Sequence, residues 1–243
     1  MRVWTLDWLD DAERVKNEIK VMIDSIEVKS ETVKPIVKPA YAKIEFEKME
    51  ETEFTKYSSE LYTSAVITMQ GTSDDYYLEE SFDKIGMVAS TLIEKEAPIS
   101  KKLLMRKVLN AWGISRGGSR VEGIFSSALA RIDKIITKDE DRVFFWKKDQ
   151  VPEHYEIYRV EDANGNKRSM DDIPSKEILN AIVEVLKEQV SLSEMDLLRE
   201  TAKKFGFSRL GNVIETSVKY AIFVGINEGN LVRLDNGNIV LSE

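Results

Sequence analysis

The sequence contains no cysteine and only one histidine, His154. Without cysteine there is no disulfide bond and no thiolate zinc site, and a single imidazole argues against a nucleophile–base pair. No run of 18 apolar residues is present to cross a bilayer, and the N-terminus lacks the regions of a signal peptide. We therefore expect a cytoplasmic protein that makes no membrane contact and holds no metal or cofactor, with His154 in an exposed loop.

Basic residues are fewer than acidic ones: the sequence has 35 Lys and Arg residues and 43 Asp and Glu residues, which gives a net charge of −8. This balance argues against a uniformly basic nucleic-acid-binding protein. The charge is unevenly distributed, however. Residues 85–148 contain 13 basic and 7 acidic residues, whereas residues 1–84 contain 11 and 19. One basic segment therefore lies within an acidic chain.

What the sequence does contain is an internal repeat with an offset of 93 residues, which places residues 103–119 on residues 196–212. The register holds without a gap on both sides of this stretch. The aligned pairs include Ile85 with Ile178, Gly113 with Gly206, Arg116 with Arg209, and Ala128 with Ala221. Two copies are too few for a solenoid, so the repeat predicts two homologous small domains in tandem.

Each copy predicts three helices followed by a β-hairpin. Apolar spacing places the helices at 81–95, 101–112 and 120–135 in the first copy, and at 175–188, 193–205 and 212–225 in the second. The strands are expected at 136–138 and 142–147, and again at 231–234 and 238–241. Three helices followed by a hairpin is the winged-helix plan, a variant of helix-turn-helix.

Several short stretches of the repeat resemble one protein family. They are E-A-P-I at 96–99, L-L-x-R at 103–106, A-W-G-I-S-R-x-G-S-R at 111–120 and I-P-x-x-E-I at 173–178. These are similar to the C-terminal domain of unknown function of many large bacterial and archaeal superfamily-one helicases. R-V-W-T-L-D-W at 2–8 resembles the end of the very-short-patch-repair-endonuclease-like domain that precedes it there. The resemblance implies a C-terminal fragment of such a helicase, and it implies no catalytic residue.

We therefore expect an α+β protein with tandem winged-helix domains, a charged N-terminal linker and a strand–helix remnant. The expected segments are a remnant of a nuclease-like domain at 1–28, a charged linker at 29–79, winged helix 1 at 80–148, a hairpin insert at 149–173 and winged helix 2 at 174–243. The helix of the remnant should begin after Asp10 and Asp11, where Val15 and Ile19 start an apolar stripe. The sequence gives no indication of oligomeric state.

The candidate binding residues are polar and basic side chains of the first copy. Arg116, Ser119 and Arg120 stand where the third helix begins, and both arginine and a helix N-terminus suit phosphate oxygens. The second helix and the hairpin add Lys101, Lys102, Arg106, Arg142 and Lys147. These residues predict a non-catalytic nucleic-acid-binding module that contacts the phosphates of DNA, or of RNA. The family resemblance implies that such a module works beside the helicase motor and nuclease domains of its parent chain.

Other interpretations stay open. Arg116 recurs as Arg209 in the second copy, which is not basic, so we favour a structural role in which each arginine bonds its own turn. Lys102 aligns with Met195 and Arg120 with Val213, so these two cations are better binding candidates. The alternative function is a protein–protein interaction module that docks on the helicase motor or on itself.

Two further candidates are weaker. Glu45, Glu47 and Lys48 form an E-x-E-K run, similar to the acid–lysine motif that some nucleases use to hold Mg²⁺, but so short a motif recurs easily in a chain rich in Glu and Lys. Four aromatic residues could stack on bases, although we expect them in the core because large aromatics dominate burial. They are Trp112, Trp146, Phe205 and Phe207.

Overall fold

The computed structural model describes residues 12–27, 58–162 and 165–242. The chain divides into two compact units, residues 1–52 and residues 53–243. In the first unit the structure describes α2 (Ala12–Glu27), which confirms the helix expected after Asp11. Val15 is buried and Ile19 is exposed there. Residues 1–11 and the E-x-E-K run at 45–48 lie outside the described residues.

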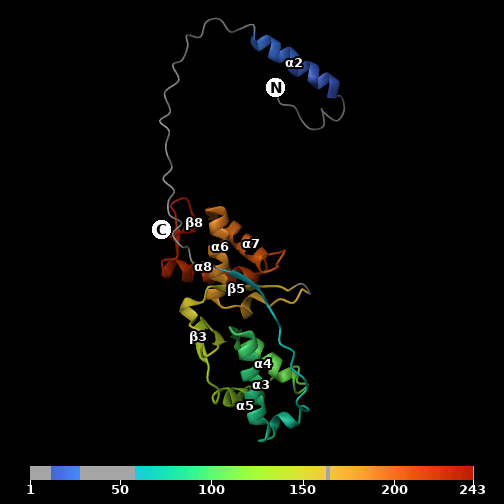
Figure 1. Ribbon diagram of the computed structural model, residues 1–243, viewed down its shortest axis with the longest axis vertical. Helices are drawn as coiled ribbons and strands as arrows, with labels where there is room; N and C mark the ends of the chain where they lie inside the picture. The colour runs from blue at the N-terminus through green and yellow to red at the C-terminus, as the bar shows by residue number, and fades with distance from the viewer. Residues whose placement is uncertain (1–11, 28–57, 163–164, 243) are drawn as a thin grey trace. The chain divides into compact units, whose positions relative to one another are not determined.

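The second unit contains two halves built from the same elements (Figure 1). The first half, residues 81–146, comprises α3 (Ser81–Glu96), β2 (Ile99–Ser100), α4 (Lys101–Asn110), α5 (Ser119–Leu129), β3 (Ile135–Asp139) and β4 (Arg142–Trp146). The second half, residues 175–241, comprises α6 (Ser175–Gln189), β6 (Ser191–Ser193), α7 (Glu194–Lys204), α8 (Asn212–Asn227), β7 (Leu231–Arg233) and β8 (Asn238–Leu241). The expected mixture of helices and strands is therefore confirmed.

The correspondence between the halves extends to topology and backbone detail. The three-stranded antiparallel sheets have the orders β2-β4-β3 and β6-β8-β7, so the last strand of each half is central. Gly113 and Gly206 occupy the same place after the second helix and have φ angles of 67° and 78°, a conformation that favours glycine. Ser100 and Ser193 each cap the second helix by accepting a backbone N–H.

Each half has its own apolar core. Trp112 and Phe125 lie in the first core, and Phe205 lies in the second. Trp112, Trp146 and Phe205 are all buried, which confirms that these aromatics are core residues rather than exposed stacking platforms. Phe207 is half-buried against the second core.

The end of α5 differs from the expectation. The helix stops at Leu129 rather than at residue 135, and β3 already begins at Ile135. Lys134 explains the early stop, because its Nζ donates to the carbonyl oxygens of Leu129 at 2.5 Å and of Ile132 at 3.0 Å. These bonds satisfy carbonyls that the end of a helix leaves open.

The hairpin insert expected at 149–173 forms no hairpin among its described residues. β5 (Ile157–Val160) pairs in parallel with β1 (Ser58–Leu61), and the segment after it leads into η3 (Met170–Asp172). Arg168 accounts for this path, because its buried guanidinium donates to the carbonyl of Arg159 and to the carboxylate of Glu177. The side chain is thereby turned toward the interior and not toward a partner strand.

β1 lies in the segment that was expected to be a linker. Beyond it, Tyr62 is buried and its hydroxyl donates to Glu96, while the N–H of Gln70 donates to the carbonyl of Ala111 at 2.7 Å. The short helices η1 (Asp75–Tyr77) and η2 (Pro152–His154) complete the unit, and His154 is exposed as expected. Residues 58–79 thus belong to the folded unit.

Buried polar contacts fix the two halves to one another. Arg159 donates to the carbonyl oxygens of Glu96 at 2.8 Å and Pro98 at 2.7 Å, and its Nη2 lies 3.1 Å from the carboxylate of Glu177. Asp139 at the end of β3 accepts the N–H and the hydroxyl of Ser175 at the start of α6. Charged groups so deeply buried are stable only when paired in this way. Among the described helices, none has the length and apolar character that crossing a membrane requires.

Candidate nucleic-acid interface

Three of the candidate residues line one cavity of about 690 Å³ beside the start of α4. Lys101 and Lys102 come from α4, and Arg142 comes from the start of β4. The remaining lining residues are Ser100, Met105, Glu122, Asp141, Val143 and Asp171. Three cations therefore meet three carboxylates, and the cavity has no excess of positive charge.

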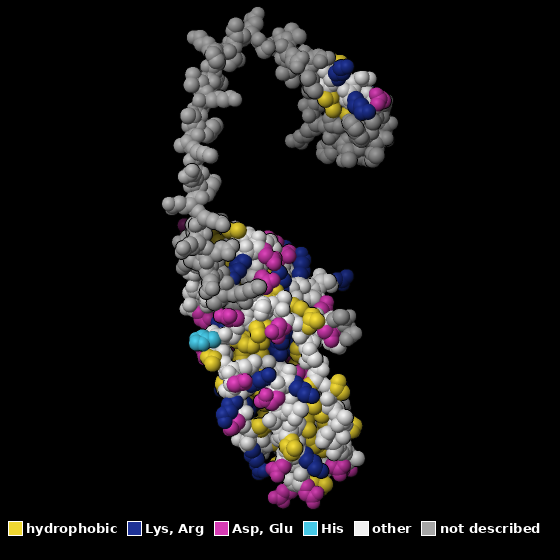
Figure 2. Space-filling model, viewed as in Figure 1, with side chains coloured by type: hydrophobic (Ala, Val, Ile, Leu, Met, Phe, Trp, Pro, Cys, Tyr) yellow, Lys and Arg dark blue, Asp and Glu magenta, His cyan; other side chains and the backbone are white. Residues whose placement is uncertain are grey.

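The lysines and arginine of α4 are paired with these and neighbouring acids. Lys101 lies 3.1 Å from Glu122, and Lys102 lies 2.6 Å from Asp171. The hydrogen bond to Asp171 raises the pKa of Lys102. Burial acts to raise the pKa of Asp171, but hydrogen bonds from Lys102 and Ser169 outweigh it and lower that pKa. Figure 2 shows the same intermixing of cations and anions over the visible face.

The N-terminus of α4 is occupied by the chain's own carboxylates. The hydroxyl of Ser100 accepts the N–H of Leu103 and donates to Asp172, whose side chain is fully buried. Arg106 reaches the same carboxylate at 3.7 Å. Burial raises the pKa of Asp172. Asp171 and Asp172 would therefore repel a phosphate at this end of the helix. Lys102 and Arg106 are for this reason poorer candidates for phosphate binding.

Two candidates of the hairpin are placed differently from the expectation. Arg142 turns toward the second half, where its Nη1 lies 3.1 Å from the hydroxyl of Ser217 and its guanidinium lies 5.6 Å from the ring centre of Tyr220. It serves as a contact between the halves. Lys147 is half-buried, and its backbone N–H donates to Gln150 at 3.0 Å.

The start of α5 is the most open part of the candidate interface. Arg116, Ser119 and Arg120 are all exposed. The guanidinium of Arg120 lies 4.7 Å from the ring centre of Tyr77, which orients it by a cation–π contact. Arg116 forms no hydrogen bond or ion pair within the described part of the chain.

The structural role favoured for Arg116 is therefore wrong. Neither Arg116 nor its equivalent Arg209 bonds to the turn that carries it, as far as the described residues show. Backbone bonds hold these turns instead, since the N–H of Ile114 donates to Leu109 and the N–H of Phe207 donates to Ala202, each at 3.0 Å. Both arginine side chains are consequently available to a ligand.

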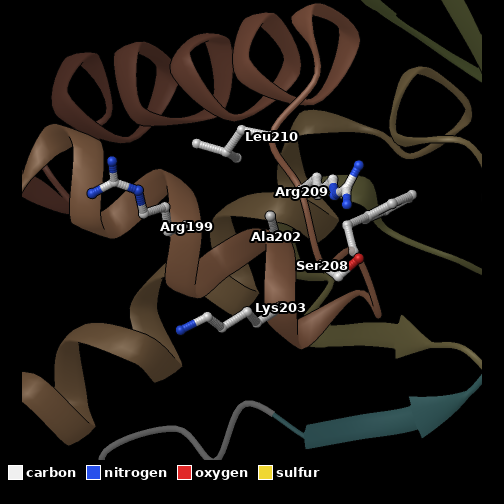
Figure 3. Close-up of a pocket in the computed structure, with 7 residues that line it drawn as sticks. Arg199, Ala202, Lys203, Ser208, Arg209 and Leu210 are labelled. Atoms are coloured by element: carbon white, nitrogen blue, oxygen red, sulfur yellow. The ribbon is translucent and has the colours of Figure 1, made fainter.

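A second groove, which sequence reasoning missed, lies at the turn between α7 and α8 (Figure 3). Its volume is about 340 Å³, and its lining combines three cations with four other residues: Arg199, Lys203, Arg209, Ala202, Phe207, Ser208 and Leu210. No carboxylate lines it. The second copy is not basic overall, so its net charge gave no indication of this local excess of cations. The alignment of Arg209 with Arg116 could have indicated it.

No cluster of three His, Asp or Glu side chains suited to a metal ion occurs in the described residues. A family model described as "Protein of unknown function (DUF3320)" matches residues 74–123, which include α3, α4 and the first turn of α5. No curated protein matches the chain.

Proposed function

We propose that the chain is a non-catalytic nucleic-acid-binding module in which the two halves are tandem winged-helix domains. The supporting topology is repeated: in each half three helices precede an antiparallel hairpin, and a short strand before the second helix pairs with the hairpin. In this plan the third helix, α5 or α8, is the one that meets the nucleic acid.

The observation that carries the proposal is the open cationic start of α5. Arg116 and Arg120 are exposed beside Ser119, and the first amide groups of a helix carry partial positive charge. Phosphate oxygens are bound by this combination of guanidinium, hydroxyl and backbone N–H groups. Because such contacts do not read bases, binding should have little sequence preference.

The ion pairs on α4 reduce the contribution of this helix to phosphate binding but do not remove it. Lys101 and Lys102 remain partly exposed, and exposed ion pairs contribute only about 0–1 kcal/mol. Either lysine can therefore exchange its partner for a phosphate, but the carboxylate that it leaves behind would repel the same phosphate. The start of α5 is for this reason the principal contact.

The sequence resemblance supports an accessory role. The stretch A-W-G-I-S-R-x-G-S-R, which is similar to the C-terminal domain of superfamily-one helicases, ends at Arg120. The proposed partners are DNA, or RNA, together with the helicase motor and nuclease domains of a parent chain. In this proposal the module holds nucleic acid and catalyses no reaction.

The test is nucleic-acid binding by the double variant Arg116→Glu with Arg120→Glu. Fluorescence anisotropy with labelled duplex, forked and single-stranded DNA at low salt should show that the variant loses at least about tenfold in affinity, since two phosphate contacts become repulsive. Lys84→Glu is the matched control, because Lys84 is exposed on α3 of the same half and its replacement changes the charge equally per site. Equal affinities of the double variant and the wild type would refute the proposal.

An interaction module is the second candidate, and one observation favours it. Met195 and Val213, the equivalents of Lys102 and Arg120, leave 43% and 47% of their surface exposed. An exposed apolar pair at that position suits a protein surface better than a phosphate. If the wild type binds no nucleic acid at low salt, and Met195→Lys with Val213→Lys abolishes concentration-dependent self-association in sedimentation, this second function replaces the first.

A further inference from the structure

The groove between α7 and α8 differs from the cavity at α4 in its charge balance. The α4 cavity combines three cations with three carboxylates, whereas Arg199, Lys203 and Arg209 line the second groove with no carboxylate among the lining residues. Coulomb attraction for an anion depends on this local excess and not on the net charge of the domain. The second groove is therefore the better anion site of the two, although it lies in the less basic half.

The cations of the groove are available to a ligand. Arg209 is exposed and has no hydrogen-bond or ion-pair partner within the described ranges. Arg199 lies 3.0 Å from Asp196, and Lys203 lies 2.7 Å from Glu200, each three residues away on α7. Such surface pairs contribute only about 0–1 kcal/mol. Unlike Glu122 and Asp171 at α4, Asp196 and Glu200 do not line the cavity beside their cations, so a phosphate in the groove can replace either carboxylate.

The turn that carries Arg209 is held firmly. Lys167 donates to the carbonyl of Gly206 at 2.7 Å, and its Nζ lies 4.9 Å from the ring centre of Phe207. Gly206 itself adopts the positive φ that the turn requires. A rigid backbone keeps the start of the Arg209 side chain in place, so less freedom is lost when a ligand binds.

Figure 3 shows how the side chains lie. Arg199 and Lys203 extend from α7 on one side of the groove, and Arg209 extends from the turn on the other, with Leu210 between them. The guanidinium of Arg209 points away from the other two, so binding requires its rotation toward them. Exposed side chains change rotamer within nanoseconds, and this motion is no barrier to binding.

We infer that the groove lined by Arg199, Lys203 and Arg209 is a second phosphate-binding site, which takes a phosphodiester group of a nucleic-acid backbone. This inference rests on the proposed function and assigns a contact to the second half, where Lys102 and Arg120 of the first half have the apolar equivalents Met195 and Val213. Arg116 and Arg209 then play the same part in the two copies of the repeat. The apolar residues Phe207 and Leu210 give the adjoining sugar a surface to pack on.

The test compares Arg209→Glu with Arg209→Lys, using labelled duplex and single-stranded DNA at low salt. Charge reversal should lower affinity about tenfold and make the salt dependence shallower by roughly one phosphate contact. Arg209→Lys keeps the charge and should stay within about threefold of the wild type. Lys84→Glu again controls for net charge, and circular dichroism verifies that each variant is folded.

The outcomes separate this inference from the proposed function. Loss of binding in the Arg116/Arg120 double variant, with wild-type affinity in Arg209→Glu, overturns the second site alone. Loss in Arg209→Glu, with wild-type affinity in the double variant, supports the second site and overturns the first. If Arg209→Glu abolishes thermal stabilisation by inorganic phosphate but leaves DNA affinity unchanged, the groove binds free anions and the assignment to nucleic acid is wrong.

Discussion

The Nζ of Lys102 lies 2.6 Å from a carboxylate oxygen of Asp171, so a cation expected to face nucleic acid is paired with an acid of its own chain. Asp171→Asn would release that lysine. Because an exposed pair is worth up to about 1 kcal/mol, we predict that this variant binds duplex DNA about two- to fivefold more tightly at low salt. Fluorescence anisotropy titration measures the change.

Asp235→Asn is the control for this prediction, since Asp235 is exposed in the turn between β7 and β8 and its replacement alters the net charge equally. Its affinity should stay close to that of the wild type. A weaker complex of Asp171→Asn, or an equal gain in both variants, would show that the pair does not restrain Lys102.

Arg159 should be one of the residues that stability depends on most. It joins the carboxylate of Glu177 to carbonyl oxygens of the first half, and both charged groups are buried. Arg159→Ala leaves buried acceptors without a donor, so we predict a loss of about 3–5 kcal/mol in the free energy of unfolding. Urea denaturation followed by circular dichroism gives this value.

Arg131→Ala provides the comparison, because Arg131 and its partner Asp83 are both exposed. Its effect should be under about 0.5 kcal/mol. Similar losses for the two arginines would mean that the buried cluster does not hold the halves together.

The buried cluster of Arg159, Arg168 and Glu177 predicts that the protein loses stability in acid. Burial acts to raise the pKa of Glu177, but the guanidinium groups of Arg159 and Arg168 outweigh it and lower this pKa from 4.5 to about 2. A lowered folded-state pKa contributes stability above the unfolded value, and this contribution disappears as the pH falls from 4.5 toward 2. Urea midpoints over this window should decrease with falling pH.

Glu177→Gln should be less stable than the wild type at neutral pH, because it removes a buried charge from between two guanidinium groups. Its unfolding free energy should also depend less on pH over the same acid range. If the two proteins lost stability in parallel on acidification, Glu177 would not be the group responsible.

The turn glycines offer a test of the repeat. Gly206 has a φ of 78°, and a Cβ added there would overlap the carboxyl group of Glu161. Gly206→Ala should cost at least about 1–2 kcal/mol of stability, the usual strain of a left-handed residue, and Gly113→Ala should behave similarly. Gly118→Ala, where a Cβ meets nothing within 4 Å, should be nearly neutral in thermal denaturation. A penalty at only one of the first two positions would contradict their equivalence.

Much of the fold could be predicted because its determinants are local. Apolar spacing and the glycine after the second helix located α3, α4 and α6 to α8 closely, and the offset of the repeat identified Gly113 with Gly206. The end of α5 and the pairing of β5 with β1 were not predictable in this way. The end of α5 was missed because the apolar spacing continues to Ile132 and Ile135, beyond the point where Lys134 bonds the carbonyl of Leu129. The strand pairing was missed because it joins Ser58–Leu61 to residues about a hundred positions away.

The candidate site was harder to predict than the fold. Counting cations identified the first half as the basic segment of the sequence. No sequence pattern indicated that Asp171 and Asp172, about seventy positions away, would lie against Lys102 and Arg106. The groove at Arg209 was missed for the opposite reason, because the acids that balance the second half lie outside its lining. Charge composition gives a total, whereas binding depends on where each charge lies.

The salt dependence of DNA affinity tests the central claim most directly. Each phosphate contact contributes a slope of about −0.9 to the logarithm of affinity against the logarithm of salt concentration, so a module that uses both halves should give about −3 or steeper. We predict that slope for the wild type, with a shallower one after Arg116→Glu with Arg120→Glu. No binding to duplex, forked or single-stranded DNA at low salt, or an affinity indifferent to salt, would contradict the account.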